Sequence, residues 1–351
     1  MKTLLRAGAA AAVLTVAVLL LPRPELAAAL QRLRSLPWYG LAALLLLQTV
    51  SLAMIGVQWT LVLRCLSRSG DAAVRQTGPA SPAGNRIGWP AVMLRYLGGS
   101  LIESITPSAK LGGEAARLVL FGRRFGLCAR RLAGAAVTHK VAMLAGLLPA
   151  VAAAVVITGS GTVSRLLGIP AAAAALAAAA LLPAIAAAIV LLRRGLQRAG
   201  AAAPPARLLT GLAAIALLVW LLYPLKVALA ARVAGIAVDP AAIVAATFGA
   251  YVLGLLPITP GGLGAYEAGM LGILMASGLG AADAAALTLL SRVVTFWWPL
   301  LLSAGAGLTL IARGRRPAAL TPQLPAHDCS PETRREHDLD LFRFPARRGA
   351  A

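Results

Sequence analysis

Six long runs of mostly apolar residues constrain the fold of this chain more than any other feature. A helix crosses the hydrocarbon core of a bilayer with about 20 apolar residues, because each residue adds about 1.5 Å to its length. A backbone in lipid must also satisfy its own hydrogen bonds, which favours helices over irregular chain. We therefore predict an all-α polytopic membrane protein with six full spans, at residues 4–22, 38–63, 132–157, 169–192, 208–231 and 285–311.

The charge distribution supports this interpretation and suggests an orientation. Charged residues make up 13% of the chain, against about 25% in soluble domains. A net charge of +21 can indicate nucleic-acid binding. Here, however, the Arg residues stand in short loops between apolar runs, where they set topology and meet anionic headgroups. We expect no nucleic-acid partner, and we predict a multi-pass protein of the bacterial inner membrane with both termini in the cytoplasm.

The two ends of the chain carry weaker signals. The first run is expected to be a retained span, because Pro22 to Pro24 lacks the small-residue pattern of a cleavage site. The amphipathic segment 25–36 is predicted to lie at the interface, and the polar residues 312–351 are predicted to form a disordered cytoplasmic tail. We expect no metal or cofactor, since no phosphate-binding loop is present and the tail residues fit no closed zinc pattern (His327, Cys329 and His337).

Two further regions, 91–122 and 241–281, are apolar but interrupted by Thr-Pro and glycines. Their halves are mostly too short to cross a bilayer. We therefore predict two re-entrant hairpins, the first entering from the cytoplasm and the second from outside. The alternative is that each half crosses the membrane fully. Two crossings would return the chain to the same side, so the orientation of the other spans would not change.

The two broken regions share a motif. Each contains Ile-Thr-Pro, then six residues, then Glu-Ala. The motif begins at Ile105 and again at Ile258, which is 153 positions later, so that Glu114 corresponds to Glu267. The flanking spans correspond as well but run in opposite senses. This pattern predicts an inverted-topology repeat, as in many secondary transporters, with halves at about 38–157 and 208–311 within a membrane domain of residues 1–311.

The residues of the motif are suited to breaking a helix inside a membrane protein. Proline removes a backbone donor and glycine permits irregular backbone. Such backbone must be buried in protein or line a cavity, and the positive end of the following half-helix could hold a phosphate. We interpret a group of residues chiefly as shaping these breaks, namely Thr106, Pro107, Gly112, Gly113, Thr259, Pro260, Gly261, Gly262 and Gly264.

Ionisable residues at membrane depth are costly, so they are candidates for function. Glu114 and Glu267 lead, although each could simply stabilise the start of a half-helix through the helix dipole. At the repeat offset His139 corresponds to Arg292, and both stand inside long apolar runs. They are candidate headgroup contacts or a proton relay, with a structural pair to the hairpin Glu as the alternative. The adjacent Lys140 could take the place of His139.

Three further cations complete the candidates. Arg117 and Lys110 could bind a lipid phosphate, although Arg117 could instead extend to the interface. Arg95 and Glu103 stand eight residues apart, roughly on one helix face, and are as compatible with a packing pair as with a site.

The broken regions resemble the lysylphosphatidylglycerol synthase transmembrane family, also described as flippase-like. The resemblance covers about residues 1–315. It is carried by Thr106-Pro107 with Gly112-Gly113-Glu114 and Arg117, by the more specific stretch from Pro257 to Gly264 with Glu267, and by Ser291-Arg292 with Trp298-Pro299.

This resemblance implies a domain that moves a phospholipid or lipid-linked molecule between leaflets, with an anionic or phosphate-bearing lipid as partner. Bifunctional members also carry a cytoplasmic aminoacyl-transferase domain, so we do not expect lysyl transfer by this chain. Two alternatives stay open. The chain could be a non-catalytic subunit beside a lipid-synthesising enzyme, or a membrane-embedded lipid headgroup transferase.

Overall fold

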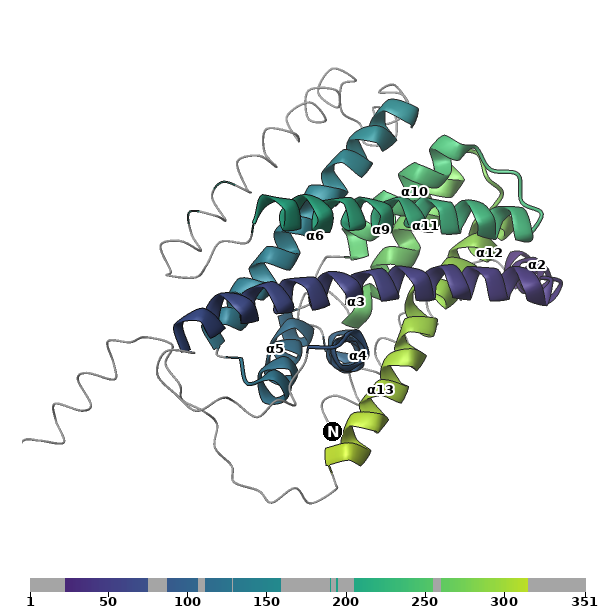
Figure 1. Ribbon diagram of the computed structural model, residues 1–351. Helices are drawn as coiled ribbons and strands as arrows, with labels where there is room; N and C mark the ends of the chain where they lie inside the picture. Colours follow the sequence, from purple (N-terminus) through teal and green to yellow (C-terminus); the bar gives the residue numbers. More distant parts are fainter. Residues whose placement is uncertain are drawn as a thin grey trace, which may run out of the picture.

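The computed structural model describes residues 23–74, 87–106, 111–127, 129–158, 190, 194, 205–254 and 260–314. All regular elements in these ranges are helices (Figure 1). The predicted span 4–22, nearly all of the predicted span 169–192 and almost all of the predicted tail lie outside the described residues. The same is true of Pro107, Lys110 and Thr259.

Four helices are long and apolar enough to cross a bilayer, by length and composition. They are α3 (Trp38–Val74), α6 (Ala129–Thr158), α9 (Ala206–Val233) and the run formed by α12 (Ala281–Arg292), the π-helix η2 (Val293–Trp297) and α13 (Trp298–Gly314). These elements confirm the helices predicted at four of the six apolar runs. The chain is therefore an all-α, multi-pass membrane protein. A short helix, α2 (Arg23–Arg34), covers most of the segment predicted to lie at the interface.

Each broken region forms a pair of short helices that pack side by side. The first pair is α4 (Trp89–Ile105) and α5 (Leu111–Phe125), and the second is α10 (Pro240–Gly254) and α11 (Ala265–Ala276), which follows the one-turn helix η1 (Pro260–Gly262). The longest of them, α4, has 17 residues and so extends about 25 Å, less than the roughly 30 Å of a hydrocarbon core. Re-entrant hairpins remain our prediction on this ground.

Local backbone chemistry explains where the hairpins break. Helix α4 ends at Ile105, and the next residue, Thr106, has extended φ and ψ of −107° and 131°, which are those favoured before a proline. In the second hairpin Gly261, Gly262 and Gly264 all have positive φ, and a β-carbon on Gly262 would lie 2.6 Å from the carbonyl oxygen of Gly254. Only glycine meets both requirements without strain.

The interpretation of Gly112 and Gly113 as break residues needs correction. Both lie in the first turn of α5, after the break. Gly113 instead allows α5 to approach α4 closely, because a β-carbon on it would lie 2.4 Å from the β-carbon of Glu103.

Helices α3 and α9 run side by side across the molecule (Figure 1). Gln48 of α3 contacts Lys226 of α9. Gln58, which is later in α3, donates to the carbonyl oxygen of Leu212, which is earlier in α9. The two helices are therefore antiparallel, which an inverted repeat requires of this corresponding pair.

Corresponding helices also have corresponding neighbours. Helix α4 packs on α3 as α10 packs on α9, α5 on α6 as α11 on α12, and α4 on α13 as α10 on α6. Two halves related by a two-fold axis would produce this pattern, and the inverted repeat stays a prediction that the packing favours.

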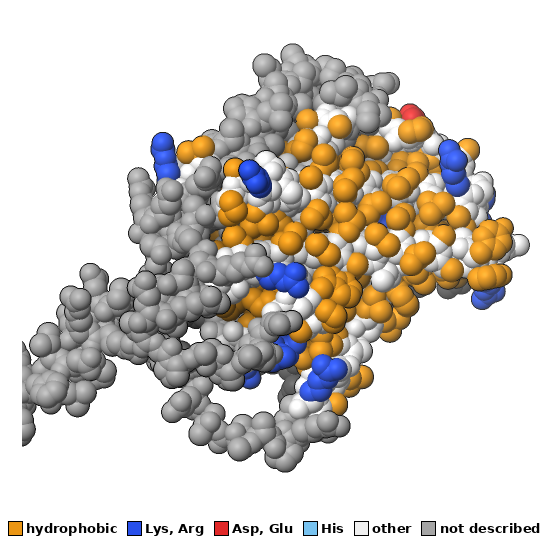
Figure 2. Space-filling model, in the orientation of Figure 1, with side chains coloured by type: hydrophobic (Ala, Val, Ile, Leu, Met, Phe, Trp, Pro, Cys, Tyr) orange, Lys and Arg blue, Asp and Glu red, His pale blue; other side chains and the backbone are white. Residues whose placement is uncertain are grey.

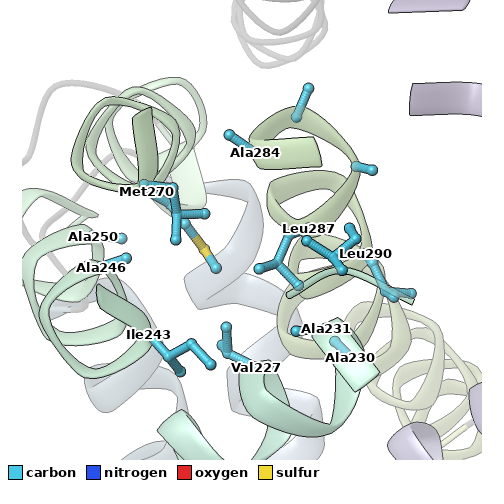
Figure 3. Packing of buried hydrophobic residues seen from close by; sticks show 14 of the residues in the cluster. Val227, Ala230, Ala231, Ile243, Ala246, Ala250, Met270, Ala284, Leu287 and Leu290 are labelled. Atoms are coloured by element: carbon cyan, nitrogen blue, oxygen red, sulfur yellow. The ribbon is translucent and has the colours of Figure 1, made fainter. Parts of the chain in front are cut away.

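The interior contains two clusters of buried apolar side chains. Each is centred on one half but includes residues of the other, such as Leu44 of α3 in the second-half cluster and Leu212 of α9 in the first-half cluster. The second-half cluster is rich in alanine, which lets helices α9 to α12 approach closely. Met270 of α11 points into the space bordered by Ala246, Val227 and Leu287 (Figure 3). The first-half cluster is built around Trp59 and Phe121 instead. The rings of Trp59 and Phe121 pack together between α3 and α5, with their centroids 5.2 Å apart.

The described part of the face drawn in Figure 2 is broadly apolar, and most of its Lys and Arg side chains stand toward the edges. Large side chains such as Leu46, Leu301 and Leu308 are each at least 65% exposed. An apolar surface of this extent is unfavourable in water and marks a membrane-facing protein.

Candidate functional site: two buried ion-pair clusters

A buried ion pair between Glu267 and Arg292 lies at the break of the second hairpin. Arg292 Nε donates to Glu267 Oε1 at 2.5 Å, and Glu267 Oε2 accepts the Gly264 backbone N–H at 2.7 Å. Arg292 Nη2 also donates to the Gly261 carbonyl oxygen at 3.2 Å. The pair thus satisfies backbone groups that the break leaves free and ties α12 to the start of α11.

Aromatic rings enclose the guanidinium group of Arg292. Its Cζ lies 4.7 Å from the ring centroid of Tyr266 and 4.7 Å from that of Phe296, distances that permit cation–π attraction. Phe296 belongs to the π-helix η2, which begins directly after Arg292. Such π-helical turns are frequent at functional sites because they redirect side chains.

Arg117 is the centre of the first cluster and is also buried. Its Nη1 donates to Glu114 Oε1 at 2.8 Å, and its Nη2 donates to Ser100 Oγ at 2.9 Å and to the Glu103 carboxylate. The guanidinium carbon lies 4.7 Å from the ring centroid of Tyr96. Arg117 therefore joins the two arms of the hairpin.

Lys140 also contributes to this cluster, with its Nζ 2.5 Å from Glu114 Oε1. His139 does not join it. The imidazole is buried and stacks on Trp59 with ring centroids 4.6 Å apart, and neither ring nitrogen has a hydrogen-bond partner among the described residues. The pairing with Glu114, which was the alternative considered for His139, is therefore made by Lys140.

The predicted candidates thus separate into two groups. The structure brings Glu267 together with Arg292, and Glu114 together with Arg117, while His139 stands apart. Arg95 and Glu103 do not pair, because Arg95 donates to the Ala91 carbonyl and Glu103 turns to Arg117. Helix α4 packs against η1, so the arm that carries Glu103 touches the break of the other hairpin.

Sequence reasoning missed one buried cation, Lys226 of α9, which is 2% exposed. Its ammonium group donates to Gln48 Oε1 at 2.5 Å and to Ser51 Oγ at 3.4 Å. A signal was present in the sequence, since Lys226 is the single charged residue in the apolar run 208–231.

Both clusters hold cations against carboxylates. The first holds Arg117 and Lys140 against two carboxylates, and the second holds one arginine against one. Among the described residues no group of three potential metal ligands occurs. The start of α11, where a phosphate was expected, is capped by Glu267 instead. An incoming anion would therefore have to take the place of that carboxylate.

Comparison with known proteins places the chain among membrane regions. The family model for the lysylphosphatidylglycerol synthase TM region matches residues 6–303. No curated protein matches the chain significantly. The matched span includes both hairpins and both ion-pair clusters.

Proposed function

Because the chain belongs to the family of the lysylphosphatidylglycerol synthase transmembrane region, we propose that it moves a phosphate-bearing lipid between the leaflets of a bacterial inner membrane. The observation that carries this proposal is the buried Glu267–Arg292 pair at a helix break. An ion pair at membrane depth is expensive to maintain and is characteristic of substrate pathways, and broken helices are where secondary transporters bind their cargo.

The pair can bind a lipid phosphate by exchanging partners. Arginine forms two parallel hydrogen bonds with phosphate as readily as with carboxylate. A phosphate that displaces Glu267 would receive Arg292 and the Gly264 N–H, two donors that now serve the carboxylate. When the lipid leaves, Glu267 returns. Because an anion always faces Arg292, the arginine is never left as an unpaired buried charge.

Lipid exchange between leaflets of liposomes tests the proposal. Purified protein is reconstituted with fluorescent phosphatidylglycerol, and the fraction of label reached by an external quencher is followed over time. The test variant is Glu267→Gln/Arg292→Gln. It removes both charges together, so neither is left buried and alone, and the new amide oxygen at 267 can still accept the Gly264 N–H.

A matched control is the pair Arg32→Gln/Asp283→Asn. It removes another ion pair, with an N–O distance of 2.7 Å, that links α2 to α12 and is partly exposed. We expect exchange by the wild type and by the control, and its loss in the test variant. A folded wild type that exchanges no lipid would overturn the proposal and favour a non-catalytic subunit beside a lipid-synthesising enzyme. Undiminished exchange in the test variant would make the pair structural.

A further inference from the structure

The buried cation of α9, Lys226, has no carboxylate partner among the described residues, unlike the buried cations of the two ion-pair clusters. Seven of the 12 Asp and Glu residues precede residue 315, and the other five stand in 315–351. The seven are Glu25, Asp71, Glu103, Glu114, Asp239, Glu267 and Asp283. Of these, the three that stand in the hairpins are already held by Arg117, Lys140 and Arg292.

No carboxylate among the described residues contacts Lys226. Asp239 accepts the Ala241 backbone N–H and is exposed, and Asp283 pairs with Arg32. Asp71 stands in α3, 23 residues from the Gln48 that Lys226 contacts, which is about 35 Å along a helix. The described side chains around this ammonium are therefore neutral.

Neutral groups surround Lys226 in a way that suits a cation. Gln48 and Ser51 of α3 present oxygens to its Nζ, and the ring centroid of Tyr223 lies 4.1 Å from it. Such contacts partly replace water, but they supply no negative charge. A buried cation without a counter-charge is costly, so a protein that keeps one offers a place for an anion.

We propose that Lys226, with Gln48 and Ser51, forms a phosphate-binding site at the contact between α3 and α9, separate from the two ion-pair clusters. This inference rests on the proposed function and gives it a substrate class, lipids with a phosphodiester headgroup. The phosphate supplies the negative charge that no described side chain offers to the Lys226 ammonium. The polar groups of Gln48 and Ser51 can turn their donors toward phosphate oxygens.

The position of this site couples binding to movement. Helices α3 and α9 correspond to each other in the predicted repeat, and Lys226 lies where they touch. Gln48 and Ser51 of α3 cover the ammonium in this structure, so a phosphate that binds between them and Lys226 must widen the contact between α3 and α9. Binding therefore favours a state in which the two helices have parted, which is the movement that alternating access by two halves requires.

Binding to the purified full-length chain tests this site directly. Dissociation constants are measured by native mass spectrometry for phosphatidylglycerol, for a glucosyl-diacylglycerol with the same acyl chains, and for inorganic phosphate. The glycolipid has no phosphate, and inorganic phosphate has no lipid. The variants are Lys226→Gln, whose amide can still donate to Gln48 and preserve the fold, and Lys226→Arg, which keeps the charge. Arg232→Gln, an exposed cation near the end of the same helix, is the matched control.

We expect Lys226→Gln to weaken phosphatidylglycerol binding roughly tenfold to a hundredfold, the scale of one charge-assisted hydrogen bond. Glycolipid binding should not change, Lys226→Arg should retain part of the affinity, and Arg232→Gln should match the wild type. Competition by inorganic phosphate that depends on Lys226 would assign the site to the phosphate group itself. Without such competition, the whole lipid headgroup is the ligand. Equal phosphatidylglycerol affinity in the wild type and Lys226→Gln would overturn the inference.

The transport assay separates this inference from the proposed function. If the wild type exchanges phosphatidylglycerol faster than the glycolipid and Lys226→Gln equalises the two rates, both stand. If Lys226→Gln weakens binding but the wild type exchanges no lipid, the site stands and the transport proposal falls. If exchange occurs with an unchanged preference in Lys226→Gln, the transport proposal stands and the site falls.

Discussion

Gly113 of α5 lies so close to Glu103 of α4 that a β-carbon on the glycine would stand 2.4 Å from the Glu103 β-carbon and 3.0 Å from its carboxylate oxygen. The absence of a side chain at 113 thus allows Glu103 to reach Arg117 across the hairpin. Gly99 in α4, the other arm of the hairpin, leaves room for Arg117 in the same way, because a β-carbon on it would lie 2.2 Å from Arg117 Cγ.

Gly113→Ala should therefore destabilise the protein by about 1–3 kcal/mol, because overpacking forces the two arms apart. Gly305→Ala is the matched control, since no atom of the described residues lies within 4 Å of the β-carbon it would add and alanine favours the helix. Thermal unfolding in detergent measures both. A Gly113→Ala protein as stable as the control would contradict the close packing of α4 on α5.

The two cations that hold Glu114 should differ in their effect on stability. Arg117→Gln leaves Glu103 without its guanidinium partner and removes the centre of the cluster, so we expect a loss of about 3–5 kcal/mol. Lys140→Gln should cost about 1 kcal/mol or less, because Lys140 is 48% exposed and Glu114 keeps Arg117. Unfolding temperatures of the two variants in one detergent give the comparison, and equal losses would count against Arg117 as the centre.

The break of the second hairpin should tolerate no β-carbon at Gly262. An alanine there must adopt a φ of 66°, which costs roughly 1–2 kcal/mol, and its β-carbon would clash with the carbonyl oxygen of Gly254. We expect Gly262→Ala to lower the yield of folded protein in size-exclusion chromatography and to slow lipid exchange. Gly272→Ala in α11 should behave as the wild type, because its β-carbon would meet no other described residue within 4 Å. Similar yields for both variants would argue against a strained break.

Cysteine labelling distinguishes a re-entrant hairpin from two full crossings. In a variant without the native cysteines, Thr106→Cys should resist a membrane-impermeant thiol reagent added outside intact cells, because a re-entrant break stays within the membrane. Two full crossings would instead carry residue 106 to the outer surface and expose it to the reagent. Ser277→Cys, an exposed position after α11, is predicted to lie outside and should react, which provides the positive control.

Much of the architecture could be predicted from local sequence. The lengths of the apolar runs predicted α3, α6, α9 and the α12–α13 run, because hydropathy and helix length are properties of contiguous residues. The hairpin arms were predictable for the same reason, since proline and glycine act on the backbone where they stand. The π-helix after Arg292 was not predicted, and no residue in that stretch breaks helices in the same way.

Partner choice depended on the tertiary structure. The repeat spacing singled out Glu114, Glu267 and Arg292, which all form ion pairs in the structure, but it also singled out His139, while Lys140 makes the contact with Glu114. Adjacent helical residues point about 100° apart, because a turn holds 3.6 residues. The rotation of α6 against α5 therefore decides which of the two meets Glu114, and a linear pattern does not contain that rotation.

Sequence alone determined that this chain is a helical membrane protein with two interrupted hairpins, because burial in lipid imposes its demands on each segment separately. The tertiary structure decided which charges are neutralised. Arg117 and Arg292 have carboxylates because successive helices pack so that Glu103 reaches Arg117 and Glu267 reaches Arg292. Lys226 contacts only neutral groups among the described side chains. Coulomb energy depends on distance in space, and those distances are set by how the helices pack.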